Sequence, residues 1–346
     1  MRIAIDITPL ETGHKDRGVG TYTKLLIEAL QKYERGHSYH FFTRGQSVPK
    51  NVDLVHYPYF DPYFLTLPVL KSCRTVVTVH DLIPLVFPEH FPAGVRGMVK
   101  WQVQRLSLRR TTRIITDSDA SKQDIIRIAG ISSHIIDVVR LAPADAFRVV
   151  TAKPLLQAVA MKYKLPEKFI LYVGDINWNK NIPGLLESFQ KFNQKKIKLM
   201  LIGKAFVERS PEANAIQASI DAYGICDDVI MPGFVPLNDL PALYSLASVY
   251  VQPSHYEGFG LPILEAMACG CPVISARSPG LSEISGSSIV VDLHIHGDLE
   301  KCLRGVLSLS MASRLKLIQE GILWAKQYSW ERVAHKTVQS YEKSVA

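Results

Sequence analysis

The stretch Pro253-Ser-His-Tyr-Glu257-Gly-Phe-Gly-Leu-Pro-Ile-Leu-Glu265-Ala-Met-Ala-Cys-Gly270 is the most informative segment of this chain of 346 residues. Glu257 follows an apolar strand pattern, at a turn where Gly258 and Gly260 permit close approach of a ligand. Pro262 suits the first turn of a helix, so the loop leads a ligand to a helix N-terminus. Free N–H groups at that terminus favour a sugar phosphate or a polyhydroxyl compound.

Glu265 lies about one turn into the same expected helix. A bare pair of glutamates is more often exposed to solvent, but here the neighbours of Glu265 are apolar: Leu261, Ile263, Leu264 and Met267. Each carboxylate of such a pair can accept paired hydrogen bonds from vicinal hydroxyls. The pattern therefore favours a site for a hydroxylated ligand over a charged surface.

Outward from this stretch, apolar runs alternate with helical patterns, which is typical of parallel α/β units. In the first half we expect strands at Arg2–Ile7, Tyr39–Thr43, Leu54–Tyr57, Thr75–His80, Arg113–Thr116 and Ile136–Arg140. In the second half we expect them at Phe169–Val173, Lys198–Ile202, Val229–Met231, Ser248–Gln252, Val273–Ser275 and Ile289–Val291. Expected helices are Thr21–Tyr33, Val95–Arg110, Ser118–Gly130, Pro183–Phe192, Leu240–Leu246, Pro262–Cys269 and Leu299–Leu309. The segment Val149–Pro166 lacks a strand pattern, so we place the connection between two domains there.

The charge balance points to an anionic partner. Lys and Arg number 40 against 32 Asp and Glu, a net charge of +8. Nucleotide phosphates, nucleic acid and an acidic membrane surface all fit this excess. Five cysteines are too few and too scattered for a disulfide scaffold. Neither a secretory signal nor an apolar run of about 20 residues is visible, so a cytoplasmic protein is expected.

Three further segments carry polar residues where an α/β fold places its ligands. Lys180 lies just past the strand expected to end at Val173, although an isolated loop lysine is more often solvated. His80 closes an apolar strand and precedes Asp81, so it can point into a cleft. Gly18-Val19-Gly20 opens the first long helix without the dinucleotide fingerprint, which argues against an NAD-dependent enzyme.

These residues together resemble the retaining glycosyltransferases of family 4. The 253–270 stretch is similar to the E-x7-E signature of that family. Four other segments resemble family segments in the same order: Gly18-Val-Gly20-Thr-Tyr, Thr78-Val-His80-Asp81-Leu-Ile-Pro, Tyr172-Val-Gly174 with Lys180-Asn181, and Gly233-Phe-Val235. The resemblance runs from about residue 2 to Trp330.

The resemblance implies a GT-B fold, in which two Rossmann-like domains face each other across a deep cleft. The first domain, at 1–155, would hold the acceptor, and the second, at 165–330, the nucleotide sugar. A C-terminal helix at 331–346 would pack back on the first domain.

The implied reaction is transfer of a sugar from a nucleoside diphosphate donor, with retention and without cofactor or metal. Glu257 would contact hydroxyls of the donor sugar, Lys180 the diphosphate, and His80 the sugar near its anomeric end. Glu265 would hold the ribose hydroxyls. Other implied donor-binding residues are Gly258, Phe259, Gly260, Leu261, Phe234, Val235, Gly174 and Asn177. Gly18, Val19, Gly20 and Asp81 would form the acceptor or phosphate loop.

One position departs from the family pattern. The family usually places an arginine as well as a lysine in the phosphate loop, and no arginine lies between Gly174 and Lys180. Asn177, Asn179 or a residue of the first domain is expected to substitute.

The segment Ile83-Pro84…Phe87-Pro88-Glu89 looks most like the mannosyltransferase branch, which favours GDP-mannose and a glycan or polyprenyl-linked acceptor in polysaccharide biosynthesis. Open alternatives are a dTDP- or UDP-sugar donor, an epimerase or hydrolase of the same fold, and a basic protein that binds nucleic acid or membrane. Nucleic acid is not favoured, because no RRM, helix-turn-helix or zinc pattern is present.

A basic cluster lies in the segment Arg96–Arg113. Arg105, Arg109 and Arg113 recur every four residues, so they are expected to share one helix face. A solvated helix would explain them, and so would contact with anionic lipid, which would suit a lipid-linked acceptor and a peripheral position on the cytoplasmic membrane face.

Overall fold

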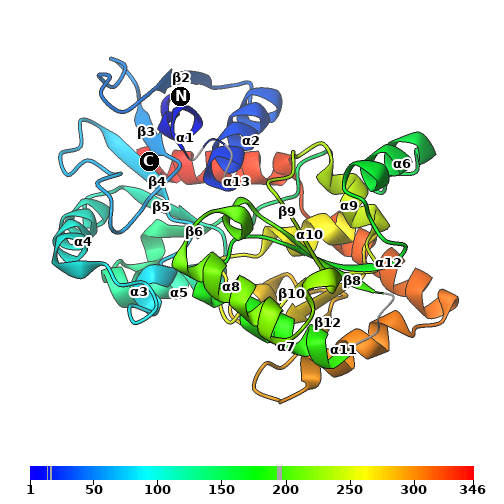
Figure 1. Cartoon of the computed structure of the whole chain (residues 1–346). Helices are drawn as coiled ribbons and strands as arrows, with labels where there is room; N and C mark the ends of the chain where they lie inside the picture. Colours follow the sequence, from blue (N-terminus) through cyan, green and yellow to red (C-terminus); the bar gives the residue numbers. More distant parts are fainter. Residues whose placement is uncertain (14, 16–17, 193–196) are drawn as a thin grey trace. The chain divides into compact units, whose positions relative to one another are not determined.

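The computed structural model describes residues 1–13, 15, 18–192 and 197–346. The chain forms two compact units, drawn in Figure 1. The first unit contains Met1–Ala142 and Ser329–Ala346, and the second contains Pro143–Tyr328. Each unit is built on its own sheet of parallel strands.

The first sheet has the strand order β2-β1-β3-β4-β5-β6. Its strands are β1 (Arg2–Asp6), β2 (Ser38–Phe42), β3 (Leu54–Tyr57), β4 (Arg74–Thr78), β5 (Arg113–Thr116) and β6 (Ile136–Val138). The chain adds β2 on one side of β1 and β3 on the other, so the direction of strand addition reverses between β1 and β3. Because Ile5 pairs with His56, Asp6 and Tyr57 lie at the carboxyl ends of the two strands that flank this switch point.

The helices of the first unit connect these strands and cover the sheet. They are α1 (Thr8–Glu11), α2 (Gly18–Tyr33), α3 (Ile83–Val86), α4 (Gly94–Arg109), α5 (Asp119–Asp124) with a π-helical turn at Ile125–Ala129, and α13 (Trp330–Val345). Ser118, the first residue of the helix expected at 118–130, caps α5: its hydroxyl accepts from the Ser121 N–H at 3.0 Å. The segment ends at Gly130, whose φ of +67° suits a glycine.

The C-terminal helix α13 belongs to the first unit and lies beside α2 (Figure 1). The Tyr341 hydroxyl lies 2.7 Å from His56 Nδ1, and His56 Nε2 lies 2.8 Å from Thr78 Oγ1. Burial lowers the pKa of His56 to about 3, so its ring stays neutral. A buried polar network thus joins α13 to β3 and β4.

The arginines of the basic cluster do not form the single helix face expected from their spacing. The helix α4 ends at Arg109, and Arg113 lies in β5, where it pairs with Asp137 at 2.8 Å. The Nε atoms of Arg105 and Arg109 both donate to the carbonyl of Ala129 at 3.2 Å, at the end of the π-helical turn. These two side chains therefore bind a neighbouring helix end, which sequence spacing alone does not reveal.

The second sheet has the strand order β12-β11-β10-β7-β8-β9. Its strands are β7 (Phe169–Val173), β8 (Lys198–Ile202), β9 (Val229–Gly233), β10 (Val249–Gln252), β11 (Val273–Ala276) and β12 (Ile289–Val291). The strands β8 and β9 extend the sheet on one side of β7, and β10 to β12 extend it on the other. The loops after β7 and β10 therefore flank the switch point, where ligands of open α/β sheets bind.

The helices of the second unit are α6 (Lys153–Lys162), α7 (Ile182–Phe192), α8 (Pro211–Ala222), α9 (Leu240–Leu246), α10 (Leu261–Ala268), α11 (Asp298–Leu307) and α12 (Met311–Ala325). Three of them, α6, α8 and α12, were not expected from the sequence. Each buries few side chains, so the apolar periodicity that marks a helix is weak there.

The division between the units lies at Ala142 and Pro143, earlier than the expected connection at 149–166. The chain after Pro143 packs on α9 of the second unit. The Phe147 ring lies 6.0 Å from the Tyr244 ring, and the Val150 N–H donates to Ser245 Oγ at 3.1 Å. The segment after Pro143 belongs to the second unit because it packs on α9. It carries no strand pattern, so this packing could not be predicted from the sequence.

Two kinds of feature are absent from the part of the chain that the structure describes. No helix in it is both long enough and apolar enough to cross a bilayer. No group of three or more His, Cys, Asp or Glu side chains in it is arranged to hold a metal ion.

Candidate active site

Two loops meet at the switch point of the second sheet, one after β7 and one after β10. Asn179, only 3% exposed, joins them: its Nδ2 donates to the Tyr256 carbonyl at 2.9 Å. In return its own carbonyl accepts from the His255 N–H at 2.8 Å. These bonds fix the position of the neighbouring Lys180 relative to the β10 loop.

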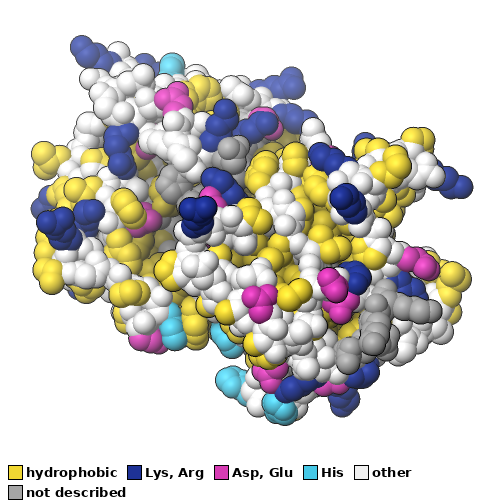
Figure 2. Space-filling model, viewed as in Figure 1, with side chains coloured by type: hydrophobic (Ala, Val, Ile, Leu, Met, Phe, Trp, Pro, Cys, Tyr) yellow, Lys and Arg dark blue, Asp and Glu magenta, His cyan; other side chains and the backbone are white. Residues whose placement is uncertain are grey.

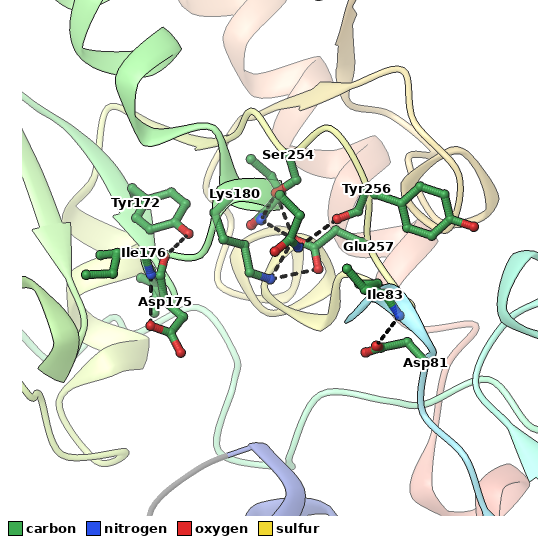
Figure 3. Close-up of polar contacts among 12 residues, drawn as sticks. Asp81, Ile83, Tyr172, Asp175, Ile176, Lys180, Ser254, Tyr256 and Glu257 are labelled. Carbon is green, nitrogen blue, oxygen red and sulfur yellow. Dashed lines mark hydrogen bonds and ion pairs between the residues drawn. The ribbon is translucent and has the colours of Figure 1, made fainter. Parts of the chain in front are cut away.

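Lys180 and Glu257 form an ion pair between the two loops, as Figure 3 shows. The Lys180 ammonium lies 2.8 Å from both carboxylate oxygens, and the two side chains are 20% and 8% exposed. Glu257 Oε1 also accepts from Gln252 Nε2 at 2.8 Å and from Ser254 Oγ at 2.7 Å. Among the described contacts, Oε2 accepts from Lys180 alone. That oxygen keeps the capacity to accept a bond from a ligand hydroxyl.

The glycine loop between Glu257 and α10 is held tightly against the segment after β11. Gly260 has a φ of +93°, and a Cβ there would lie 2.3 Å from Leu281 Cδ2. A Cβ at Gly280 would lie 2.1 Å from the Glu257 carbonyl oxygen. Only glycine fits at these positions. The loop therefore passes directly into the N-terminus of α10, which carries a partial positive charge.

Glu265 projects from α10 and accepts a hydrogen bond from the Tyr244 hydroxyl at 3.2 Å. Part of its surface remains accessible, but the surrounding apolar side chains raise the pKa of its carboxyl to about 7, against the opposing effect of that bond. Below that pH the group is mostly a neutral acid. Above it, the carboxylate can accept bonds from two hydroxyls.

The remaining predicted residues of the second unit lie at the same carboxyl edge. Gly174 cannot carry a Cβ, which would meet the Tyr172 hydroxyl at 2.6 Å; this hydroxyl donates to the Asp175 carbonyl at 2.8 Å (Figure 3). Phe234, 54% exposed, follows β9, and Val235 is buried. Asn177 is exposed, whereas Asn179 is occupied by the bonds between the loops. Neither amide supplies the positive charge of the arginine that this loop lacks.

His80 lies in the first unit and has a carboxylate partner. Its Nδ1 lies 2.7 Å from Asp117 Oδ2, and the Tyr22 ring packs edge-on against the imidazole at 4.6 Å. Burial by itself lowers the pKa of His80, but the charge and hydrogen bond of Asp117 raise it overall. The adjacent Asp81 has a local contact: its Oδ1 accepts from the Ile83 N–H at 3.0 Å, at the start of α3 (Figure 3).

The predicted glycine loop of the first unit is the first turn of a helix. α2 begins at Gly18, so Gly18, Val19 and Gly20 are already helical. A Cβ at Gly18 would meet no atom within 4 Å. Tyr22, in the same helix, packs against His80, so the predicted segments that contain these two residues are in contact.

Sequence reasoning missed four residues that hold these groups: Gln252, Ser254, Asp117 and Tyr244. A weak signal existed for three of them. Gln252 ends an apolar strand and Ser254 follows it closely, so their polarity interrupts a buried pattern. Asp117 likewise follows the buried strand β5 directly, but its partner His80 lies 37 residues earlier.

Comparison with known proteins identifies the family. The family model for group 1 glycosyl transferases matches residues 160–321, and that for Glycosyltransferase Family 4 matches residues 46–141. O-antigen chain mannosyltransferase B of Escherichia coli is 31% identical over 297 residues, covering 84% of this chain and 75% of that protein. The chain belongs to glycosyltransferase family 4. The resemblance found in the sequence is thereby confirmed.

A second relative is also a mannosyltransferase, in agreement with the predicted branch. The serotype-specific mannosyltransferase WbdA of Escherichia coli is 27% identical over 288 residues, covering 82% of this chain. Only 35% of WbdA is covered, so the chain spans about a third of that relative's length.

Solved structures confirm the predicted GT-B fold. Sucrose-phosphate synthase from Thermosynechococcus elongatus has a TM-score of 0.78 at 20% identity, covering 99% of this chain and 98% of that one. HepE of Anabaena, solved in complex with UDP and glucose, has a TM-score of 0.78 at 16% identity, with 99% of both chains covered. At these identities the likeness concerns the fold alone.

Proposed function

We propose that this glycosyltransferase moves mannose from GDP-mannose to a glycan or lipid-linked acceptor, with retention and without a metal. The observation that carries the proposal is the Lys180–Glu257 pair at the switch point, next to the N-terminus of α10. The mannosyltransferase relatives support mannose as the sugar, and their O-antigen names support a glycan acceptor.

The chemistry needs positive charge where the diphosphate leaves. As the bond between the anomeric carbon and the phosphate oxygen breaks, negative charge grows on that oxygen. The Lys180 ammonium and the free N–H groups of α10 would stabilise it. Glu257 Oε2 would accept from a hydroxyl of the donor sugar, and ionised Glu265 from the ribose hydroxyls.

Glu257 is better suited to hold the sugar than to attack it. Its carboxylate already accepts from Lys180, Gln252 and Ser254, and these bonds reduce its nucleophilicity. In our proposal the acceptor oxygen attacks the anomeric carbon on the face that the phosphate leaves. The acceptor proton passes to the departing phosphate oxygen, so the product keeps the configuration of the donor.

The test is a donor panel with two readouts. Thermal unfolding is measured with GDP, UDP and dTDP, and product is sought with GDP-mannose, UDP-glucose and a dTDP-sugar; UDP is included because HepE was solved with it. We expect GDP to stabilise the fold by about 2.7 kcal/mol at a hundred times its Kd. NMR should show an α-linked product, at an unchanged rate with EDTA. A β-linked product, a rate abolished by EDTA, or sugar release without any acceptor would contradict the proposal.

We further propose that α4 contacts an anionic membrane surface. Four apolar side chains on one stripe of this helix are exposed: Val95 (82%), Met98 (46%), Val99 (59%) and Leu106 (45%). Arg96 and Arg110 are exposed nearby, and Figure 2 shows basic and hydrophobic side chains together over this part of the first unit. Exposed apolar side chains beside basic ones suit the interface of an anionic bilayer.

Sedimentation with liposomes tests this contact. The protein should bind vesicles containing phosphatidylglycerol at low salt, and the double variant V95D/V99D should lose most of that binding. Leu315→Asp is the matched control, because Leu315 is 51% exposed on α12 of the other unit. Equal binding of all variants, or binding to neutral vesicles alone, would rule out this role of α4.

A further inference from the structure

A cavity of about 400 Å³ lies within the first unit, apart from the His80 cluster. Asp6, Phe42 and Tyr57, the last residues of β1, β2 and β3, contribute to its lining. Segments within 43–46 and 65–72 supply other parts of the wall. The cavity therefore includes the carboxyl ends of β1 and β3, which flank the switch point of the first sheet.

Two buried polar side chains in this cavity have unused hydrogen-bonding capacity. Asp6 is 8% exposed, and its Oδ1 accepts from both the N–H and the hydroxyl of Thr8. Within the described residues, Asp6 Oδ2 accepts no hydrogen bond. Tyr57 is also 8% exposed, and its hydroxyl makes no hydrogen bond to any described residue. An acceptor and a donor that line this cavity are thus available to a ligand.

The groups of this cavity are close enough to influence one another. Burial raises the pKa of Asp6; the hydrogen bonds from Thr8, and then the positive charge of Arg44, another lining residue, partly offset that rise. Burial and then the Asp6 charge raise the pKa of Tyr57 to about 12. The Phe42 and Tyr57 rings meet edge to face at 6.0 Å. The lining of the cavity therefore includes a carboxylate, a guanidinium, a phenol hydroxyl and an aromatic wall.

We propose that this cavity binds a neutral sugar ring, as a subsite for the acceptor glycan; the acceptor role rests on the function proposed above. Asp6 Oδ2 would accept from ring hydroxyls, while Tyr57 and Arg44 would donate to them. The aromatic side chains would pack on the C–H face of the ring. The Asp6 carboxylate offsets the charge of Arg44, so an anionic ligand gains little here.

Lys71 also lines the cavity, but it does not change this charge balance greatly. Its ammonium donates to Ser107 Oγ at 2.8 Å and to the Pro68 carbonyl, so part of its donor capacity is already used. Burial lowers the pKa of Lys71 to about 7, with a contribution from the nearby Arg110 charge, so the group is only partly protonated at neutral pH.

Ligand-detected NMR on the full chain tests the subsite without any donor. Methyl α-D-mannopyranoside and α-mannobiose are titrated against wild type, Tyr57→Phe and Asp6→Asn, with mannose 6-phosphate as the anionic probe. Tyr33→Phe is the matched control, because Tyr33 is 37% exposed on α2 and does not line the cavity. Thermal unfolding of each variant, with and without GDP, reports folding and nucleotide binding separately.

We expect wild type and Tyr33→Phe to bind the neutral mannosides equally. Tyr57→Phe and Asp6→Asn should bind them at least about fivefold more weakly, with unchanged stabilisation by GDP. Equal affinity in Tyr57→Phe, no mannoside binding by wild type at millimolar concentration, or tighter binding of mannose 6-phosphate would each overturn the proposal. If instead no nucleotide binds while the mannosides bind as expected, the proposed transfer reaction is ruled out and the proposed sugar site is supported.

Discussion

The ammonium of Lys180 lies 2.8 Å from each carboxylate oxygen of Glu257, and the pair joins loops that are 77 residues apart in the sequence. Both groups are mostly buried, at 20% and 8% exposure, so each depends on the other for charge compensation. A sugar diphosphate entering this site would compete for both partners. The pair therefore links the stability of the free protein to the chemistry of the site.

Removing one partner should affect stability and activity together. Lys180→Met or Glu257→Gln leaves a buried charge uncompensated, and we expect each to lower the free energy of unfolding of the second unit by about 3 kcal/mol. Each should also slow transfer by about 10²- to 10³-fold, because charge stabilisation or sugar positioning is lost. Chemical denaturation and initial rates measure the two effects.

The double variant K180M/E257Q separates the effect on stability from the effect on activity. It should recover most of the lost stability, since no charge is left unpaired, and none of the activity. Lys204→Met is the control, because Lys204 forms an exposed pair with Glu208 in the same unit. Wild-type turnover in either single variant would exclude the pair from the reaction.

The raised pKa of Glu265 predicts that nucleotide binding is pH-dependent. If only the carboxylate accepts from the ribose, a pKa of about 7 makes binding about tenfold tighter at pH 8 than at pH 6. The stability of the free protein should change in the opposite sense. A carboxyl whose folded pKa exceeds its unfolded value stabilises fully at low pH, and this contribution is lost as pH rises through about 7.

Isothermal titration with GDP between pH 6 and 8 measures the first effect. Glu265→Gln should bind more weakly than wild type at pH 8 and show a flat profile over this range. A wild-type profile that is equally flat would contradict the role of Glu265 in holding the ribose.

Asp117 is expected to control the protonation of His80. In Asp117→Asn the carboxylate that raises the pKa of His80 is gone and burial remains, so the pKa should fall. In wild type the raised pKa adds stability that is full below the unfolded pKa and is lost as pH rises through the folded value. This contribution of His80 to the stability at low pH should be absent in Asp117→Asn.

NMR titration of the His80 ring protons reports the pKa directly, and the pH dependence of kcat/KM reports its effect on the reaction. Asp119→Asn is the control, since Asp119 has a side chain that is 60% exposed and pairs with Arg140 instead. An unchanged His80 titration in Asp117→Asn would show that the 2.7 Å contact has no electrostatic consequence.

Tyr341→Phe should destabilise the first unit alone. The change removes only the hydroxyl that contacts His56 Nδ1, and it leaves a buried ring nitrogen without its partner. We expect a loss of about 1–3 kcal/mol in the unfolding of the first unit, with the GDP-stabilised transition of the second unchanged. Calorimetry with and without GDP resolves the two transitions, and exposed Tyr33→Phe should behave as wild type.

Most strands were predictable because they are buried on both faces of parallel sheets, although β2 at one edge is largely exposed. Segments such as Phe169–Val173 read as continuous apolar runs, and the structure has β7 with the same bounds. The helices α6, α8 and α12 were not predictable in the same way. For example, apolar residues lie on several faces of α12, and three of them, Met311, Leu315 and Leu323, are exposed, so its sequence shows little helical periodicity.

The candidate site was predictable as a set of residues, and less so as an arrangement. The spacing of Glu257 and Glu265 identified the loop, but nothing in the sequence indicated that Gln252 and Ser254 bind one oxygen of Glu257. The contact of Asp117 with His80 requires that β4 and β5 be neighbours in the sheet. Strand order and side-chain direction emerge only when the chain is folded.

The helix α13 completes a unit whose sheet is built entirely from the first part of the chain. During synthesis, β1 to β6 leave the ribosome long before Tyr341 is available to cover His56. The whole of the second unit, Pro143–Tyr328, is made in that interval and can fold first. The part of the N-terminal sheet that α13 covers therefore stays exposed until this helix has been synthesised. We expect chaperones to bind the nascent protein mainly during that interval.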